Sequence, residues 1–212
     1  SSDARRRNCS WPAGVCDVNR ISVLAVAAML LAAAIGWQSV RATSVAPLPV
    51  LYTLGGDFTL PSTLGRDLSL ADFQGEVVLL NFGFTSCPDV CPTAMARMRD
   101  VVRALPDEPL RAVFVTLDPA RDSVDRLAPY VAAFDPHFVA LTGTAAQIAG
   151  AAARYRVYRE KHAVGSSGGY GIEHSAQIYL LDGDGRVRAT FGEGVTVPAM
   201  VATVRRLLAE MS

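Results

Sequence analysis

A pair of closely spaced cysteines is the clearest candidate for a reactive or metal-binding site. Cys87 and Cys91 are separated by three residues in the segment Cys-Pro-Asp-Val-Cys-Pro. Pro92 follows the second thiol, and a helix tolerates proline in its first turn, where the missing N–H would have no partner. The pattern therefore predicts that the two thiols straddle a turn from a strand into a helix. There they could form a disulfide or converge on one metal ion.

A histidine far along the chain could complete a metal site with these thiols. His174 immediately precedes a short apolar run at 178–181 that predicts a buried strand. If the domain has a thioredoxin topology, the chain that enters this strand passes beside the thiol-bearing helix terminus, so that His174 can face Cys87 and Cys91. Two thiolates and one imidazole form a soft ligand set that suits Cu(I), and a solvent ligand would also allow Cu(II). A structural zinc site usually has four protein ligands, one more than this set provides.

Other uses of the two thiols remain open from the residues alone. In a thiol–disulfide oxidoreductase, Cys87 or Cys91 would attack the disulfide of a partner and the other cysteine would resolve the mixed disulfide, without any need for His174. A permanent disulfide would close only a short loop and stabilise the fold little. A peroxidase of the peroxiredoxin type needs a threonine three residues before its reactive cysteine, whereas Thr85 precedes Cys87 by two. Whether the protein is an enzyme depends on which use applies.

The segments around these residues predict alternating strands and helices. Apolar runs predict strands at 76–82, 111–117, 138–141, 178–181 and 186–191, and helical patterns cover 92–105, 122–134, 144–158 and 198–211. We expect Asp122 and Asp125 to form an N-cap pair at the start of the second helix. The alternation indicates a three-layer α/β domain of thioredoxin-like type with a central mixed sheet.

Several other residues with chemical potential are interpreted as structural. Met95 and Met98 fall on one stripe of a predicted helix and are expected to pack in the core. His137 and His162 have no partnering motif and are expected at the surface. Asp118 is interpreted as a turn residue, with a docking role near the site as the alternative.

The N-terminal part of the chain has the pattern of a membrane anchor. Residues 21–40 carry no charge, and a helix of this length spans roughly 30 Å, the thickness of a bilayer core. Four arginines precede the run and only Arg41 follows it closely, which places the N-terminus in the cytoplasm. The alternative is a cleaved signal peptide, whose apolar core is usually shorter. We expect a cytoplasmic tail at 1–20, a transmembrane anchor at 21–40, a linker at 41–56 and an extracytoplasmic domain at 57–212.

The composition argues against a nucleic-acid partner. The formal net charge is zero and the isoelectric point is near 6.8, whereas nucleic-acid-binding domains carry a basic face.

Two further cysteines, Cys9 and Cys16, precede the apolar run. They would lie in the cytoplasmic tail, apart from the other pair.

Four ordered motifs resemble the Sco/SenC family from about residue 55 to the C-terminus. They are NFGFTSCPDVCP at 81–92, TLDPARDS at 116–123, FDPHF at 134–138 with LTG at 141–143, and HSA at 174–176 leading into Tyr179 and Leu180. Ser86 and Glu173 depart from the histidine and aspartate that are common in relatives. Neither departure removes a ligand.

The resemblance implies a thioredoxin-fold copper chaperone of cytochrome c oxidase assembly. It implies that Cys87, Cys91 and His174 bind one copper ion, which is delivered to the copper site of a respiratory cytochrome oxidase. Some members resemble reductases of that site, so the alternative is a protein that keeps the oxidase cysteines reduced. The expected partners are the copper-site subunit of the oxidase, a thioredoxin-like reductant and the membrane, and the expected location is the periplasm or the mitochondrial intermembrane space.

Overall fold

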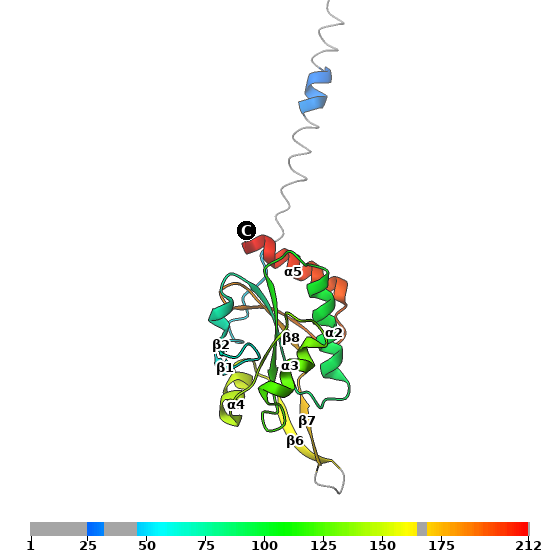
Figure 1. Ribbon diagram of the computed structural model, residues 1–212. Coiled ribbons are helices and arrows are strands. Elements are labelled where there is room, and N and C mark those ends of the chain that lie inside the picture. Colours follow the sequence, from blue (N-terminus) through cyan, green and yellow to red (C-terminus); the bar gives the residue numbers. More distant parts are fainter. Residues whose placement is uncertain (1–24, 32–45, 165–168, 212) are drawn as a thin grey trace, which may run out of the picture. The chain divides into compact units, whose positions relative to one another are not determined.

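The computed structural model describes residues 25–31, 46–164 and 169–211 (Figure 1). The chain divides into two compact units, Ser1–Ala46 and Pro47–Ser212, and the first contains a helix at residues 25–31. Among the described residues, no helix combines the length and hydropathy needed to cross a bilayer. The anchor expected at 21–40 lies partly outside the described residues and stays a prediction.

A five-stranded mixed sheet forms the centre of the second unit. Its strands lie in the order β5 (Val139–Leu141), β4 (Leu110–Thr116), β3 (Val77–Gly83), β8 (Ile178–Leu181) and β9 (Val187–Phe191). The pairs β3–β4 and β4–β5 are parallel, whereas β3–β8 and β8–β9 are antiparallel. Every residue of β3 is buried, as expected for a central strand that is covered on both faces.

Helices and a short hairpin cover the two faces of this sheet (Figure 1). One face packs against α2 (Val90–Arg103), α3 (Val124–Ala132) and α5 (Val197–Met211). The other packs against α4 (Ala145–Arg154), the 3-10 helix η1 (Leu70–Phe73) and the hairpin of β1 (Thr59–Pro61) and β2 (Asp67–Ser69). Alternate residues of β3 supply the two cores, with Leu79 in the first and Leu80 in the second. The predicted three-layer arrangement is confirmed.

The start of α3 differs from the sequence prediction. Ser123 is its N-cap, and the Ser123 side chain accepts a hydrogen bond from the Arg126 backbone N–H at 3.3 Å. The predicted cap pair of Asp122 and Asp125 is therefore wrong. Asp122 is fully buried, and its carboxylate is hydrogen-bonded to residues elsewhere in the domain rather than to the helix end.

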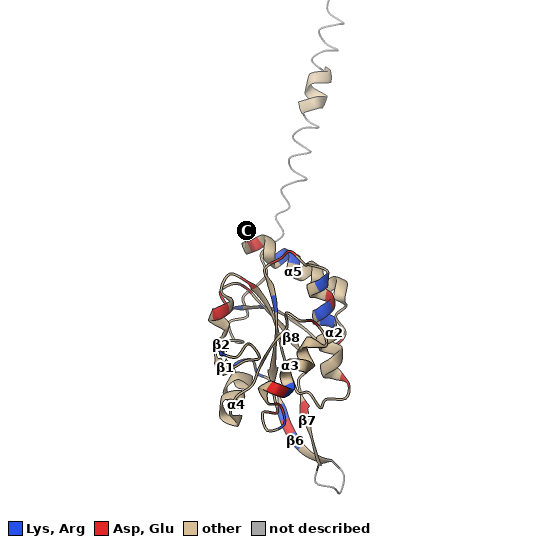
Figure 2. Ribbon diagram, in the orientation of Figure 1, with Lys and Arg blue, Asp and Glu red and all other residues tan. Residues whose placement is uncertain are grey.

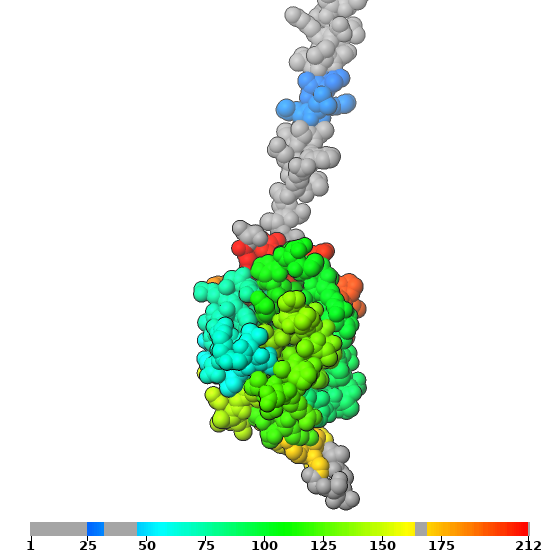
Figure 3. Space-filling view, in the orientation of Figure 1, coloured from blue at the N-terminus to red at the C-terminus, as the bar shows by residue number. Residues whose placement is uncertain are grey.

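A second hairpin follows α4 and was not among the predicted elements. The helix ends at Arg154 rather than near 158, because Arg156 adopts a left-handed conformation with φ of 52°. The chain then forms β6 (Arg159–Val164) and β7 (Gly169–His174), an antiparallel pair that belongs to neither of the other sheets. Figure 1 and Figure 3 show β6 projecting from one end of the domain.

The compact unit begins earlier than the linker expected at 41–56 would suggest. The Leu48 N–H donates to the Glu210 carboxylate at 2.7 Å, and the Leu48 carbonyl accepts from the Arg188 guanidinium. The Leu51 N–H donates to the Val187 carbonyl at 2.8 Å. Leu48 and Leu51 thus attach this segment to β9 and α5.

Candidate metal centre

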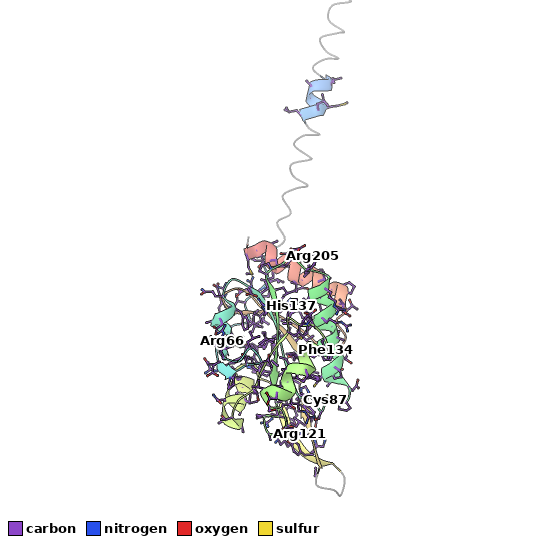
Figure 4. All side chains as sticks on the ribbon, in the orientation of Figure 1. Arg66, Cys87, Arg121, Phe134, His137 and Arg205 are labelled. Carbon is purple, nitrogen blue, oxygen red and sulfur yellow. The ribbon has the colours of Figure 1, made fainter. Side chains whose placement is uncertain are left out.

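The two cysteines occupy the turn from β3 into α2, as the position of Pro92 predicts. Cys87 lies in the turn and is half-buried, and Cys91 is the second residue of α2 and is buried. Both are free thiols. The Cys87 N–H donates to the Phe84 carbonyl at 3.2 Å, which closes the turn beneath the first thiol. Figure 4 shows Cys87 at the end of the domain from which the β6–β7 hairpin projects.

His174 meets these thiols from the other side. It is the last residue of β7, and its Nε2 atom lies 3.3 Å from the Cys91 sulfur. The ligand atoms of Cys87, Cys91 and His174 all lie within 4.8 Å of one another, and within the described part of the chain no other group of His, Cys, Asp or Glu could hold a metal ion in this way. The structure therefore brings together all three residues that the sequence analysis selected.

The orientation of the His174 ring suits metal binding. Its Nδ1 atom lies 2.9 Å from the Ser175 carbonyl oxygen, which can only accept, so Nδ1 carries the hydrogen. The lone pair of Nε2 then faces the cysteines. Burial lowers the pKa of His174, although the hydrogen bond to Ser175 opposes this shift. The Phe84 ring packs edge-on against the imidazole at 5.7 Å between centroids and restricts its rotation.

The Cys91 thiol is held as a protonated group before it binds a metal. Burial raises its pKa, and this effect outweighs the hydrogen bond from the Phe84 backbone, which lowers it. The start of a helix favours a thiolate, but at Cys91 the loss of solvent is the larger effect. A metal ion that binds here must therefore displace a proton.

Gly83 makes room for the buried thiol. A Cβ atom at this position would lie 2.8 Å from the Cys91 sulfur and 2.9 Å from Cε2 of Phe114. Any side chain at 83 would therefore push the thiol or the aromatic ring out of place. Gly83 was not among the predicted site residues, and its signal in the sequence was a glycine at the end of a buried strand.

A buried asparagine fixes the chain that follows His174. The side chain of Asn81, on β3, is 1% exposed, and its amide donates to the Gln177 carbonyl at 3.0 Å. Ser175 holds the base of the hairpin, because its N–H donates to the Tyr158 carbonyl and its hydroxyl accepts from the Tyr158 N–H. A polar residue within an otherwise apolar strand was the sequence signal for Asn81.

The remaining candidates lie where the sequence analysis expects them. Met95 and Met98 are fully buried in the core. His137 is exposed, with its ring 3.1 Å from the Asp135 carboxylate, and Figure 4 shows it well apart from Cys87. His162 is exposed on β6. None of these side chains belongs to the metal centre.

Comparison with known proteins identifies the family. The SCO1/SenC family model matches residues 49–209. The chain belongs to the SCO1/SenC family. Among curated Sco relatives, the mitochondrial SCO2 homolog of Mus musculus is 41% identical over 158 residues, which cover 73% of this chain and 62% of that protein. The SCO2-like protein of Rickettsia felis is 36% identical over 136 residues, 63% of this chain and 66% of that protein. The present chain thus covers less than two thirds of the length of each of these two relatives.

Solved Sco structures share the fold. The Bradyrhizobium japonicum ScoI structure with copper bound is 36% identical, with a TM-score of 0.67, and the match covers 73% of this chain and 99% of that one. The Arabidopsis thaliana ScoI structure with copper bound is 30% identical, with a TM-score of 0.67, over 74% of this chain and 99% of that one. The thioredoxin-like fold predicted from the sequence is that of the Sco family.

Proposed function

We propose that this Sco protein binds one copper ion through Cys87, Cys91 and His174 and delivers it to the copper site of a respiratory cytochrome oxidase during assembly. The observation that carries the proposal is the convergence of two thiol sulfurs and an imidazole nitrogen within 4.8 Å. The three donors come from α2 with its preceding turn and from β7, so only the folded domain presents them together.

The donor set favours copper over other metals. Two sulfurs and one nitrogen provide the soft, low-coordinate environment that Cu(I) prefers, whereas structural zinc usually requires a fourth protein ligand. The convergent group contains three residues in the described part of the chain. Two Sco proteins at 36% and 30% identity have structures with copper bound, which supports copper as the metal of this chain as well.

Release of the metal requires access from solvent, and the two cysteines differ in this respect. Cys91 is enclosed, whereas Cys87 is half-buried. An incoming ligand from the recipient subunit would therefore displace Cys87 before Cys91. We further propose that residues 21–40 hold the protein to a membrane with the domain on the extracytoplasmic side. A thioredoxin-like reductant would keep Cys87 and Cys91 in the reduced, dithiol form.

The free thiols also support a second function, reduction of the oxidase copper-site cysteines. Because burial raises the pKa of Cys91, Cys87 would be the attacking thiol and would form a mixed disulfide with the partner. Attack by Cys91 would then release the partner cysteine as a thiol and leave a Cys87–Cys91 disulfide. Two electrons pass to the partner, and the reductant must restore the dithiol.

Anaerobic titration of the reduced protein with copper tests the proposed metal site. We expect one copper per chain, and with Cu(II) a sulfur-to-copper charge-transfer absorption. A stoichiometry of zero would remove the chaperone function and leave the reductase function as the alternative. Titration of a Cys87→Ser, Cys91→Ser variant supplies the background for adventitious binding elsewhere in the chain.

A further inference from the structure

The loop between β4 and α3 lies next to both halves of the metal centre. The cysteine half belongs to the turn from β3 into α2, and the histidine half belongs to the β6–β7 hairpin. The loop at 117–123 contains two carboxylates, Asp118 and Asp122, and both side chains are fully buried. A buried carboxylate is costly unless hydrogen bonds or cations compensate for lost solvent, so the partners of each aspartate show what it holds.

Asp122 is bonded to the cysteine turn. Its carboxylate accepts from the Thr85 N–H at 2.9 Å, from the Thr85 hydroxyl at 2.6 Å and from the Thr116 hydroxyl at 2.7 Å. Arg126 extends this attachment, because its guanidinium donates to the Thr85 hydroxyl at 2.9 Å and to the Ser86 hydroxyl at 3.0 Å. The two residues before Cys87 are thus fastened to the loop and to the start of α3.

Asp118 is bonded to the hairpin. Its Oδ1 atom accepts from the Tyr170 hydroxyl at 2.7 Å and lies 3.8 Å from the Lys161 ammonium. Tyr170 is on β7 and Lys161 on β6, so one buried carboxylate reaches both strands. Figure 2 shows the charged residues of β6 and β7 at this end of the domain.

Arg121 reinforces the same attachment. Its Nε atom donates to the Asp118 carboxylate, and its Nη1 atom donates to the Tyr170 carbonyl at 3.1 Å. The guanidinium carbon lies 3.9 Å from the centroid of the Tyr170 ring, which is in the range of a cation–π contact. Figure 4 shows Arg121 at the same end of the domain as Cys87.

The hairpin depends on such attachments for its position. A two-stranded hairpin alone is marginally stable, and β6–β7 does not pair with the central sheet. Residues 170, 172 and 174 of β7 share one face because side chains alternate along a strand. On that face Tyr170 contacts Asp118, Ile172 packs with Phe84 and Cys91, and His174 reaches the thiols.

We propose that Asp118, acting through Tyr170, is a positioning residue for His174. One loop then holds both halves of the centre at ligand distance. This inference rests on the proposed function where copper is the probe, but the attachment of the hairpin can be measured without metal.

The first test compares Tyr170→Phe with Tyr158→Phe in metal-free protein. The Tyr158 hydroxyl donates to Glu160 within the same hairpin region, so the control removes a tyrosine hydroxyl that does not reach Asp118. Loss of a hydrogen bond to a buried charge should raise amide hydrogen exchange in 159–164 and 169–174 about tenfold in Tyr170→Phe. Tyr158→Phe should exchange as the parent does. Parental exchange in Tyr170→Phe would overturn the proposal, whether or not the parent binds copper.

The second test asks whether Tyr170 acts through His174. We expect Tyr170→Phe to weaken copper binding by about three- to tenfold, as loss of one positioning hydrogen bond allows. In a His174→Ala background the same substitution should have no further effect, because the ligand that it positions is gone. An equal loss in both backgrounds would show general destabilisation and overturn the positioning role. Absence of copper binding by the parent would remove the proposed function and leave the exchange test to decide the attachment.

Discussion

The Cys91 sulfur lies 3.3 Å from Nε2 of His174, although 83 positions separate the two residues in the chain. A metal ion bound to both atoms therefore connects the start of α2 to the end of β7. The unfolded chain cannot present this pair at low cost, because a long loop would have to close. Metal binding and folding are consequently coupled.

Replacement of His174 by alanine should remove most of the stabilisation that copper gives. A ligand that binds only the folded state stabilises it by about 4 kcal/mol at a thousandfold excess over its dissociation constant. Without the imidazole, the two thiols from one short segment can bind copper in the unfolded chain as well. The melting temperature with and without copper measures the effect, and His137→Ala, which alters an exposed histidine away from the site, is the control.

The same variant separates the two functions. Thiol exchange needs neither the imidazole nor the metal, so the disulfide exchange rate of His174→Ala should match the parent, whereas maturation of the oxidase in cells should fail. Maturation of a copper-loaded oxidase to the parental level would favour the reductase function.

Oxidation of the thiol pair should abolish copper binding. A Cys87–Cys91 disulfide offers no thiolate to the metal, and His174 alone is a weak site. Equilibrium dialysis of the oxidised and the reduced protein measures the difference, and reduction of the oxidised sample should restore one copper per chain. Equal affinity of the two forms would mean that the ligands are assigned wrongly.

Gly83→Ala should disturb the site and destabilise the domain. The new methyl group would lie 2.8 Å from the Cys91 sulfur and 2.9 Å from Phe114, and overpacking of this kind costs about 1–3 kcal/mol. Copper affinity should fall as well, because Cys91 must move. Gly150→Ala is the matched control, since a Cβ there meets nothing within 4 Å and alanine favours a helix by about 0.5–1 kcal/mol over glycine. Denaturant unfolding and copper titration of both variants give the comparison.

Asp182 should contribute stability at neutral pH that is lost in acid. Its side chain is 2% exposed and accepts hydrogen bonds from Arg186 and Arg188 at 3.0 Å. Burial alone would raise the pKa of Asp182, but the hydrogen bond from the Arg186 backbone N–H, those from the Arg188 and Arg186 guanidinium groups and that from the Asp184 backbone N–H together lower it. A lowered pKa in the folded state means that the contribution is complete above the unfolded pKa, about 3.9, and declines as the pH falls through the folded value.

Asp182→Asn tests this pH dependence. The variant should lose about 1–3 kcal/mol of unfolding free energy at pH 7, because a buried charged hydrogen-bond acceptor is removed. The difference from the parent should shrink as the pH falls below about 4. Asp184→Asn, at a side chain that is 61% exposed, should change little. A difference for Asp182→Asn that stayed constant down to the acid limit would contradict the assigned pKa shift.

The central part of the fold follows from local sequence rules. The run at 76–82 is largely apolar and bounded by glycines, so it predicts the buried strand β3. Pro92 predicts that the thiols lie at the start of a helix. The position of His174 required more, because only the expected strand order brings β8 beside β3. That order only permits His174 to join the two cysteines, and the resemblance to the Sco/SenC family implied the full ligand set.

Two features could not be read from local patterns. The strand β6 has no regular alternation of apolar and polar residues, and the docking of the β6–β7 hairpin comes from a long-range contact between Asp118 and Tyr170. Asp122 fits the local rule for a helix cap, yet Ser123 fits it equally well. The hydrogen bonds of Asp122 to Thr116 and to Thr85, which lies 37 positions away, decide between them.

The two ends of the compact unit meet at one place on the domain. The Leu48 N–H is bonded to Glu210 on the last turns of α5, and Figure 1 and Figure 4 show this region at the opposite end from Cys87 and the hairpin. A tether, fluorophore or affinity tag attached before Pro47 or after Met211 would thus leave the thiols unobstructed. Immobilised by that end, the domain presents Cys87 outward, which suits surface-based measurement of metal exchange with a soluble partner.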